Sequence, residues 1–125
     1  MAASLRIEIF PRDLDTTVTF YQSVLAFTLE RDERLAEIPY VALRRDGIRI
    51  GARRITEPVS RDARRLPAGT EIVFEVDDLH AERDRILAAG YELAEDLTAR
   101  SWGLTDLRLF DPDGYYLRLT THDHS

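Results

Sequence analysis

The chain lacks several components, and each absence excludes a class of function. It has no cysteine, which rules out disulfide bonds, thiolate metal sites and a cysteine nucleophile. It has no lysine, so all 17 basic residues are arginines, and 23 acidic residues outnumber them. The formal net charge of -6 leaves no basic surplus to neutralise phosphates. We therefore expect no nucleic-acid partner.

Longer signals are missing as well. No apolar run reaches the length of a membrane span, and the N-terminal residues lack the apolar core of a signal peptide. We therefore expect no membrane partner and a cytoplasmic protein. Neither a glycine-rich phosphate loop nor a nucleophile elbow occurs, which argues against phosphate and acyl transfer. The 125 residues, 44% hydrophobic and 32% charged, predict a single globular domain.

The chain does contain an internal repeat. Residues 101–119 alternate apolar and polar side chains around Asp113-Gly114, and the stretch around Asp46-Gly47 does the same. Alternation interrupted by an Asp-Gly pair predicts a β-hairpin in each place. Upstream, Arg12-Asp13-Leu14-Asp15 resembles Asp77-Asp78-Leu79-His80, which follows 65 residues later. A unit of this length that occurs twice predicts one domain built from two similar modules.

The first module is expected over residues 5–56, in the order β-α-β-β-β. Apolar and polar residues alternate at positions 5–9, which predicts a half-buried strand. Asp13 or Asp15 caps the helix that follows, whose apolar side chains recur at helical spacing. A short strand and a charged loop should then lead into the first hairpin, over residues 27–30 and 31–38.

The second module is expected over residues 70–121, after a proline-containing linker at 57–69. Its first strand, at 71–76, alternates in the same way as that of the first module. The apolar side of its helix is expected to consist of Leu79, Ile86 and Leu87. A strand and a loop should precede the second hairpin, over residues 91–93 and 95–101.

Several of these pieces occur in the same order in a known family. They are Arg12-Asp13-Leu14-Asp15, Phe74-Glu75-Val76-Asp77-Asp78-Leu79, Trp102-Gly103 and Phe110-Asp111-Pro112-Asp113-Gly114. With them the sequence resembles the vicinal oxygen chelate superfamily, which includes glyoxalases, extradiol dioxygenases and bleomycin resistance proteins. The resemblance implies an α+β fold in which two βαβββ modules in tandem curl mixed sheets around a cavity. It also implies assembly as a homodimer.

The resemblance further implies four places for metal ligands, on the first and last strand of each module. Their counterparts in this chain are Arg6, Gly51, Glu71 and Arg118. Arginine is permanently cationic and glycine has no side chain, so only Glu71 has the chemistry of a metal ligand. One carboxylate does not hold a catalytic divalent ion. We therefore predict no metal, no other cofactor and no catalytic residue.

A ligand-binding face remains. If the aliphatic residues of the strands pack on the helices, the opposite, concave face carries a charged set: Arg6, Glu8, Arg49, Glu71, Glu75, Arg108, Tyr116 and Arg118. Trp102, the only tryptophan, is expected in a loop at the mouth of this face, where it can stack on a planar or cationic group. Two alternatives stay open: Trp102 packs at an interface or core edge, and the charges neutralise one another.

Three functions follow from this pattern. The first is a metal-independent small-molecule binding protein that resembles bleomycin resistance proteins and sequesters an antibiotic-like compound. The second is a glyoxalase-like lyase or dioxygenase-like oxidoreductase with divergent metal ligands. The third is a dimeric scaffold that binds no ligand.

Overall fold

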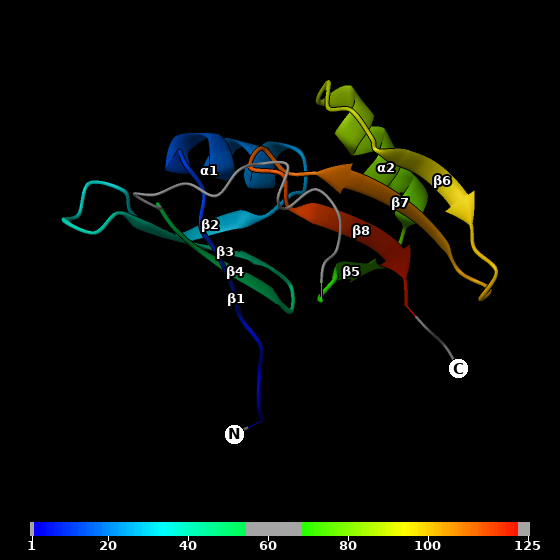
Figure 1. Cartoon of the computed structure of the whole chain (residues 1–125), viewed down its shortest axis with the longest axis horizontal. Coiled ribbons are helices and arrows are strands. Elements are labelled where there is room, and N and C mark those ends of the chain that lie inside the picture. Colours follow the sequence, from blue (N-terminus) through cyan, green and yellow to red (C-terminus); the bar gives the residue numbers. More distant parts are fainter. Residues whose placement is uncertain (1, 55–68, 123–125) are drawn as a thin grey trace. The chain divides into compact units, whose positions relative to one another are not determined.

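The computed structural model describes residues 2–54 and 69–122 and contains the β-α-β-β-β order twice (Figure 1). The chain divides into two compact units, residues 1–59 and 60–125. The first unit contains β1 (Ile7–Ile9), α1 (Leu14–Ser23), β2 (Thr28–Glu33), β3 (Tyr40–Arg45) and β4 (Ile48–Arg53). The second contains β5 (Ile72–Val76), α2 (Leu79–Ala88), β6 (Glu95–Ala99), β7 (Thr105–Phe110) and β8 (Tyr116–Thr121). The predicted α+β fold with two such modules is confirmed.

Each unit has one mixed four-stranded sheet with the same topology. The strand orders are β1-β4-β3-β2 and β5-β8-β7-β6, and in both sheets only the first pair is parallel. Ile7 lies opposite Ile50 in the first sheet, and Ile72 lies opposite Leu117 in the second. This common register agrees with the internal repeat, in which Asp46-Gly47 corresponds to Asp113-Gly114.

The two helices begin at the aspartates of the repeated motif. The Asp13 carboxylate accepts a hydrogen bond from the Asp15 amide, and the Asp78 carboxylate accepts one from the Ala81 amide. These bonds satisfy amides that have no partner within the helix. Helix α1 packs on β2, β3 and β4, and α2 packs on β7 and β8. Each sheet therefore has a helix face, which buries its aliphatic residues, and an opposite face, here called the open face.

Some predicted boundaries in the first unit are wrong. Leu5 was expected in the first strand, but it is 75% exposed, because β1 pairs with β4 only over Ile7–Ile9. The charged stretch predicted as a loop from residue 31 continues β2 as far as Glu33. Arg31 and Asp32 are exposed on this edge strand, where charged residues are tolerated because one side of the strand lacks a neighbour.

The second unit differs from the prediction in the segment after its helix. Residues 91–93 form no strand, and the strand is β6, within the segment predicted as a loop. The Tyr91 hydroxyl instead donates to the Phe110 carbonyl, and the Tyr91 amide caps the end of α2 by bonding to Ile86. Leu87 is 42% exposed and is not part of the buried side of α2. Apart from Gly69, the predicted linker 57–69 lies outside the described residues.

None of the helices in the described part of the chain is both long enough and apolar enough to span a bilayer.

Candidate functional site

The open face of the first sheet carries Arg6, Glu8 and Arg49, as the alternation predicted. Arg6 Nε lies 2.9 Å from Glu8 Oε1, so these two side chains form an ion pair. The Tyr40 hydroxyl donates to the same carboxylate, with 3.2 Å to Oε1. Arg49 Nη2 donates to Ser4 Oγ at 2.9 Å. Tyr40 was not among the predicted site residues, although it lies two residues from Ala42 on the same strand and therefore on the same face.

Gly51 makes room for the carboxylate of Glu8. The two residues are register partners on β1 and β4, and a Cβ at position 51 would collide with Glu8 Oε2 and with the Tyr40 hydroxyl. The same cluster affects Tyr40, because burial raises the pKa of its hydroxyl and the neighbouring Glu8 raises it further. The space beside Gly51 is therefore filled by a carboxylate and a protonated phenol.

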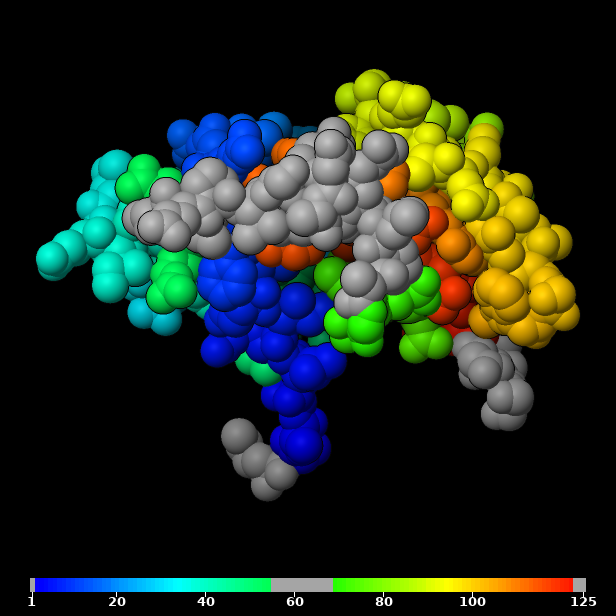
Figure 2. Space-filling model, in the orientation of Figure 1, coloured from blue at the N-terminus to red at the C-terminus, as the bar shows by residue number. Residues whose placement is uncertain are grey.

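A pocket of about 320 Å3 lies on the first unit. Three arginines, Arg6, Arg31 and Arg49, line it together with Tyr40, Glu30 and aliphatic residues of β3 and β4. The loop between β2 and β3 protrudes near one end of this unit, where the cyan atoms form a tip in Figure 2. Leu35 belongs to this loop and is fully exposed.

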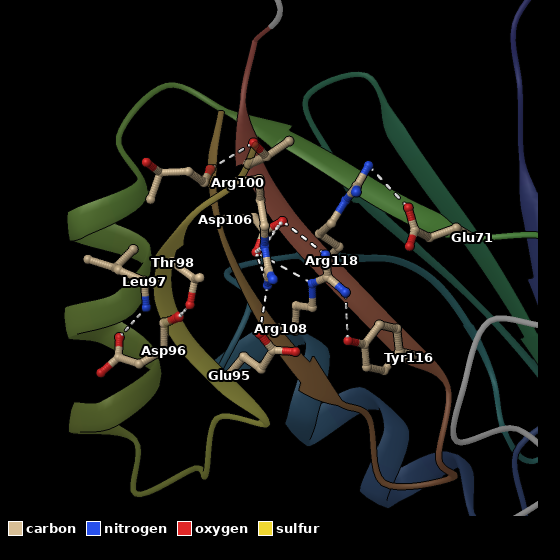
Figure 3. A network of polar contacts seen from close by, with 12 residues as sticks. Glu71, Glu95, Asp96, Leu97, Thr98, Arg100, Asp106, Arg108, Tyr116 and Arg118 are labelled. Atoms are coloured by element: carbon tan, nitrogen blue, oxygen red, sulfur yellow. Dashed lines mark hydrogen bonds and ion pairs between the residues drawn. The ribbon is translucent and has the colours of Figure 1, made fainter. Parts of the chain in front are cut away.

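The open face of the second sheet holds a network around Asp106 (Figure 3). The Asp106 side chain is 2% exposed, and Arg100 donates to it through Nε at 3.0 Å and Nη2 at 2.8 Å. Arg108 reaches the other carboxylate oxygen through Nη2 at 3.3 Å and donates from Nη1 to the Tyr116 hydroxyl at 3.1 Å. Arg100 also bonds Glu95 at 2.7 Å.

These contacts determine the charge state of Asp106. Burial acts to raise the pKa of this carboxyl, but the hydrogen bonds from Arg100 and Arg108 outweigh it and hold the pKa below its ordinary value of 3.8. Asp106 is therefore ionised at neutral pH, and it holds two guanidinium groups in place on the open face.

We expect this ionisation to make the fold sensitive to acid. Because the pKa of Asp106 is lower in the folded state, its contribution to stability is complete above 3.8 and is lost as the pH falls through the folded value. The midpoint of thermal unfolding should therefore fall more steeply with acid in the wild type than in Asp106→Asn. The difference between the unfolding midpoints of wild type and Asp106→Asn should shrink as the pH falls below the pKa of Asp106 in the folded state. A difference that stays constant from neutral to strongly acidic pH would contradict this account.

Beside this network, Arg118 on β8 connects Glu71 with Trp102. Arg118 Nη2 lies 3.1 Å from Glu71 Oε1, and its guanidinium carbon lies 5.9 Å from the centroid of the Trp102 ring. Trp102 is 57% exposed in the loop between β6 and β7. Arg118 Nε is buried and has no hydrogen-bond partner among the residues that the structure describes. A broad aromatic ring thus lies at the surface above a cation.

The comparison with protein families identifies the chain. The model of the Glyoxalase/Bleomycin resistance protein/Dioxygenase superfamily matches residues 4–119. The chain belongs to this superfamily. No curated protein matches the sequence significantly.

Solved structures of the superfamily's fold are similar over nearly the whole chain. TioX from Micromonospora sp. ML1 superposes with a TM-score of 0.78 at 23% identity, covering 98% of this chain and 100% of TioX. The bleomycin resistance determinant encoded on transposon Tn5 also gives 0.78, at 22% identity and 98% and 99% coverage. FosX, a fosfomycin resistance protein from Listeria monocytogenes, gives 0.75 at 16% identity, with 99% and 96% coverage. At these identities the likeness shows the fold.

The residues at the four positions expected for metal ligands in this superfamily do not fit a metal. Arg6 and Arg118 are cations, each already paired with a carboxylate, and Gly51 lies against Glu8 and Tyr40. Glu71 is the partner of Arg118. Within residues 2–54 and 69–122, no three histidine or acidic side chains gather to form a metal-binding group. We therefore derive no reaction step through a metal.

The structure groups the predicted site residues of this superfamily member within each unit. Arg6 meets Glu8, Arg108 meets Tyr116, and Arg118 meets both Glu71 and Trp102. Glu75 is exposed and has no ion-pair partner in the described part of the chain. The prediction missed Arg100, Asp106 and Glu95. Asp106 could have been predicted, since it lies two residues before Arg108 on β7 and therefore on the same face of the sheet.

Proposed function

We propose that the protein binds a small molecule without a metal and that this binding sequesters an antibiotic-like compound. The observation that carries the proposal is the exposed Trp102 ring above Arg118 on the open face of the second sheet. An exposed tryptophan ring is in contact with water, so a planar group that covers it removes apolar surface from water and adds stacking energy. The structural neighbours that are named for bleomycin and fosfomycin resistance support a role of this kind.

The charges around Trp102 favour a ligand of mixed character. Arg118 and Arg108 offer donors to anionic groups, while Glu71 and the exposed Glu75 offer acceptors to cationic groups. Because both signs occur on the same face, a ligand that carries a planar ring and groups of both charges satisfies more of this surface than a simple cation does. We therefore propose as the binding residues of this unit Trp102, Arg108, Glu71, Glu75, Tyr116 and Arg118.

Metal independence is part of the proposal. It is supported by the ion pairs of Arg6 and Arg118 and by the filled space beside Gly51. No contact among the described residues favours the lyase or dioxygenase alternative, because Glu71, the one carboxylate at the four expected positions, is already paired with Arg118. Assembly as a homodimer and a cytoplasmic location remain predictions of the sequence.

Titration of Trp102 fluorescence tests the proposal. As the only tryptophan it reports on this loop alone, and a bleomycin-type glycopeptide or a planar polyphenol should quench it saturably. Trp102→Ala should weaken binding of the active compound about tenfold, measured by calorimetry, since stacking and lost area are worth about 1.4 kcal/mol. Trp102→Phe should retain most of the affinity, because it keeps an aromatic face.

The same titration in excess chelator separates binding from metal chemistry. We expect an unchanged dissociation constant in the presence of EDTA. An affinity that disappears on chelation and returns with a divalent ion would contradict metal independence. An affinity unaffected by Trp102→Ala would leave the loop with a structural role only.

A further inference from the structure

The pocket of the first unit carries a second set of cations. Arg6, Arg31 and Arg49 enter its lining from three places: the residue before β1, strand β2 and strand β4. Two of these charges are neutralised locally. Arg6 pairs with Glu8 at 2.9 Å, and Arg31 pairs with Glu33 at 2.8 Å.

Arg49 is different from the other two. Its guanidinium donates one hydrogen bond, to the neutral Ser4 hydroxyl, and no carboxylate in residues 2–54 or 69–122 pairs with it. A guanidinium has five N–H donors, so most of those of Arg49 remain available to a ligand. The acidic residue in the lining, Glu30, is held by Arg44 at 2.7 Å and does not compensate Arg49.

The rest of the lining limits the size and character of what enters. Ala42 lies on the open face of β3, and Leu43 and Ile50, whose side chains are buried in the core, complete the lining where β3 and β4 pair. A volume of about 320 Å3 is near the small end for ligand pockets, so a compact molecule fits and a large glycopeptide does not enter whole. The Tyr40 hydroxyl adds a polar edge, and both burial and the neighbouring Glu8 raise its pKa.

We propose that this pocket binds the oxyanion of a small organic acid, a carboxylate or a phosphonate, through Arg49. The planar fork of arginine matches two oxygens of such a group, and the Ala42 side chain in the lining offers an apolar contact to a short carbon chain. The inference deepens the proposed function, on which it rests for the expectation that the chain binds small molecules. It uses different residues, however, and therefore has its own test.

An NMR titration of the full chain with three probes provides this test. Methylphosphonate and propionate carry the oxyanion, and propionamide is a neutral analogue of propionate. We expect saturable shifts of the β4 amides with at least one acid and none with propionamide. Arg49→Gln should weaken acid binding about tenfold or more, as expected for a charge-assisted hydrogen bond.

Arg53→Gln is the matched control. Arg53 lies on the same strand and loses the same charge, but it stacks over Phe10 at 5.5 Å and does not line the pocket. The affinity of Arg53→Gln for the acid should stay within about twofold of wild type, because this variant loses its charge outside the pocket. Equal thermal midpoints of the two variants would show that Arg49→Gln is folded. If the midpoint of Arg49→Gln is lower, Arg49→Lys replaces it as the test variant, because it keeps the charge and should keep part of the affinity.

The outcomes separate this inference from the site at Trp102. Trp102→Ala should leave acid binding unchanged, and acid binding should persist even if no compound quenches Trp102. Absence of saturable binding by both acids, equal binding of propionamide, or equal losses in Arg49→Gln and Arg53→Gln would each overturn the anion pocket.

Discussion

Replacement of Asp106 by asparagine should lower the free energy of unfolding by about 2 kcal/mol, because it leaves Arg100 and Arg108 without a common carboxylate. The side chains of Arg100 and Arg108 are 17% and 15% exposed, so solvent screens part of the cost of leaving their charges unpaired. The loss is therefore smaller than for a fully buried ion pair. The midpoint of thermal unfolding should fall by roughly 10 °C in a chain of this size.

Asp96→Asn is the matched control for Asp106→Asn. Asp96 lies on the same sheet, loses the same charge and is bound by Arg83 at 2.6 Å, but it is exposed. Because water solvates Arg83 when the carboxylate is lost, the midpoint should hardly change. If both variants lose the same stability, the burial of Asp106 has no special role in this network.

Replacement of Gly51 by alanine should destabilise the first unit by about 1–3 kcal/mol, the usual effect of overpacking. The added methyl group would overlap Glu8 Oε2 and the Tyr40 hydroxyl. Glu8 is flexible and can move away, but the Tyr40 ring is rigid, so the hydrogen bond between them should be lost. Thermal unfolding monitored by circular dichroism measures the effect.

Gly47→Ala provides the control within the same hairpin. A Cβ at position 47 meets nothing within 4 Å, and Gly47 is not among the glycines with positive φ. Alanine there should be neutral or stabilising by about 0.4–1 kcal/mol, because it restricts the unfolded chain. Adding Glu8→Ala to Gly51→Ala removes the carboxylate with which the methyl group collides, and should recover part of the loss. No recovery would contradict the steric explanation.

Gly51 and the ion pairs of the second sheet bear on the choice among the three functions. A lyase or dioxygenase with divergent ligands would need free carboxylates or imidazoles where this chain has Gly51 and Arg118. Arg108 and Arg118 of the second sheet are instead paired with Asp106 and Glu71. Donors held in this way are what the proposed binding site needs. Arg49 lies in a pocket and pairs with no carboxylate of residues 2–54 and 69–122, an arrangement that a scaffold without a ligand would not need. The titrations of Trp102 and Arg49 therefore also decide between binder and scaffold.

The sequence by itself determined the features that depend on local pattern. The two Asp-Gly hairpins, the alternating strand at 71–76 and the cap of the first helix at Asp13 or Asp15 follow from spacing and turn chemistry over a few residues. The repeat then predicted one domain built from two similar modules. The alternation also placed Arg49, Arg108 and Arg118 on the open faces, because the side-chain period of a strand is two.

Only the tertiary structure decided which of these side chains meet. The strand after α2 lies at Glu95–Ala99 and not at 91–93, since an edge strand forms where β7 offers it backbone partners. Asp106 lies between two arginines, one of them from the β6–β7 loop, and Gly51 lies beneath Glu8, a residue far away in the chain. Such contacts depend on distances between strands that are remote in sequence, which a local pattern of residues does not contain.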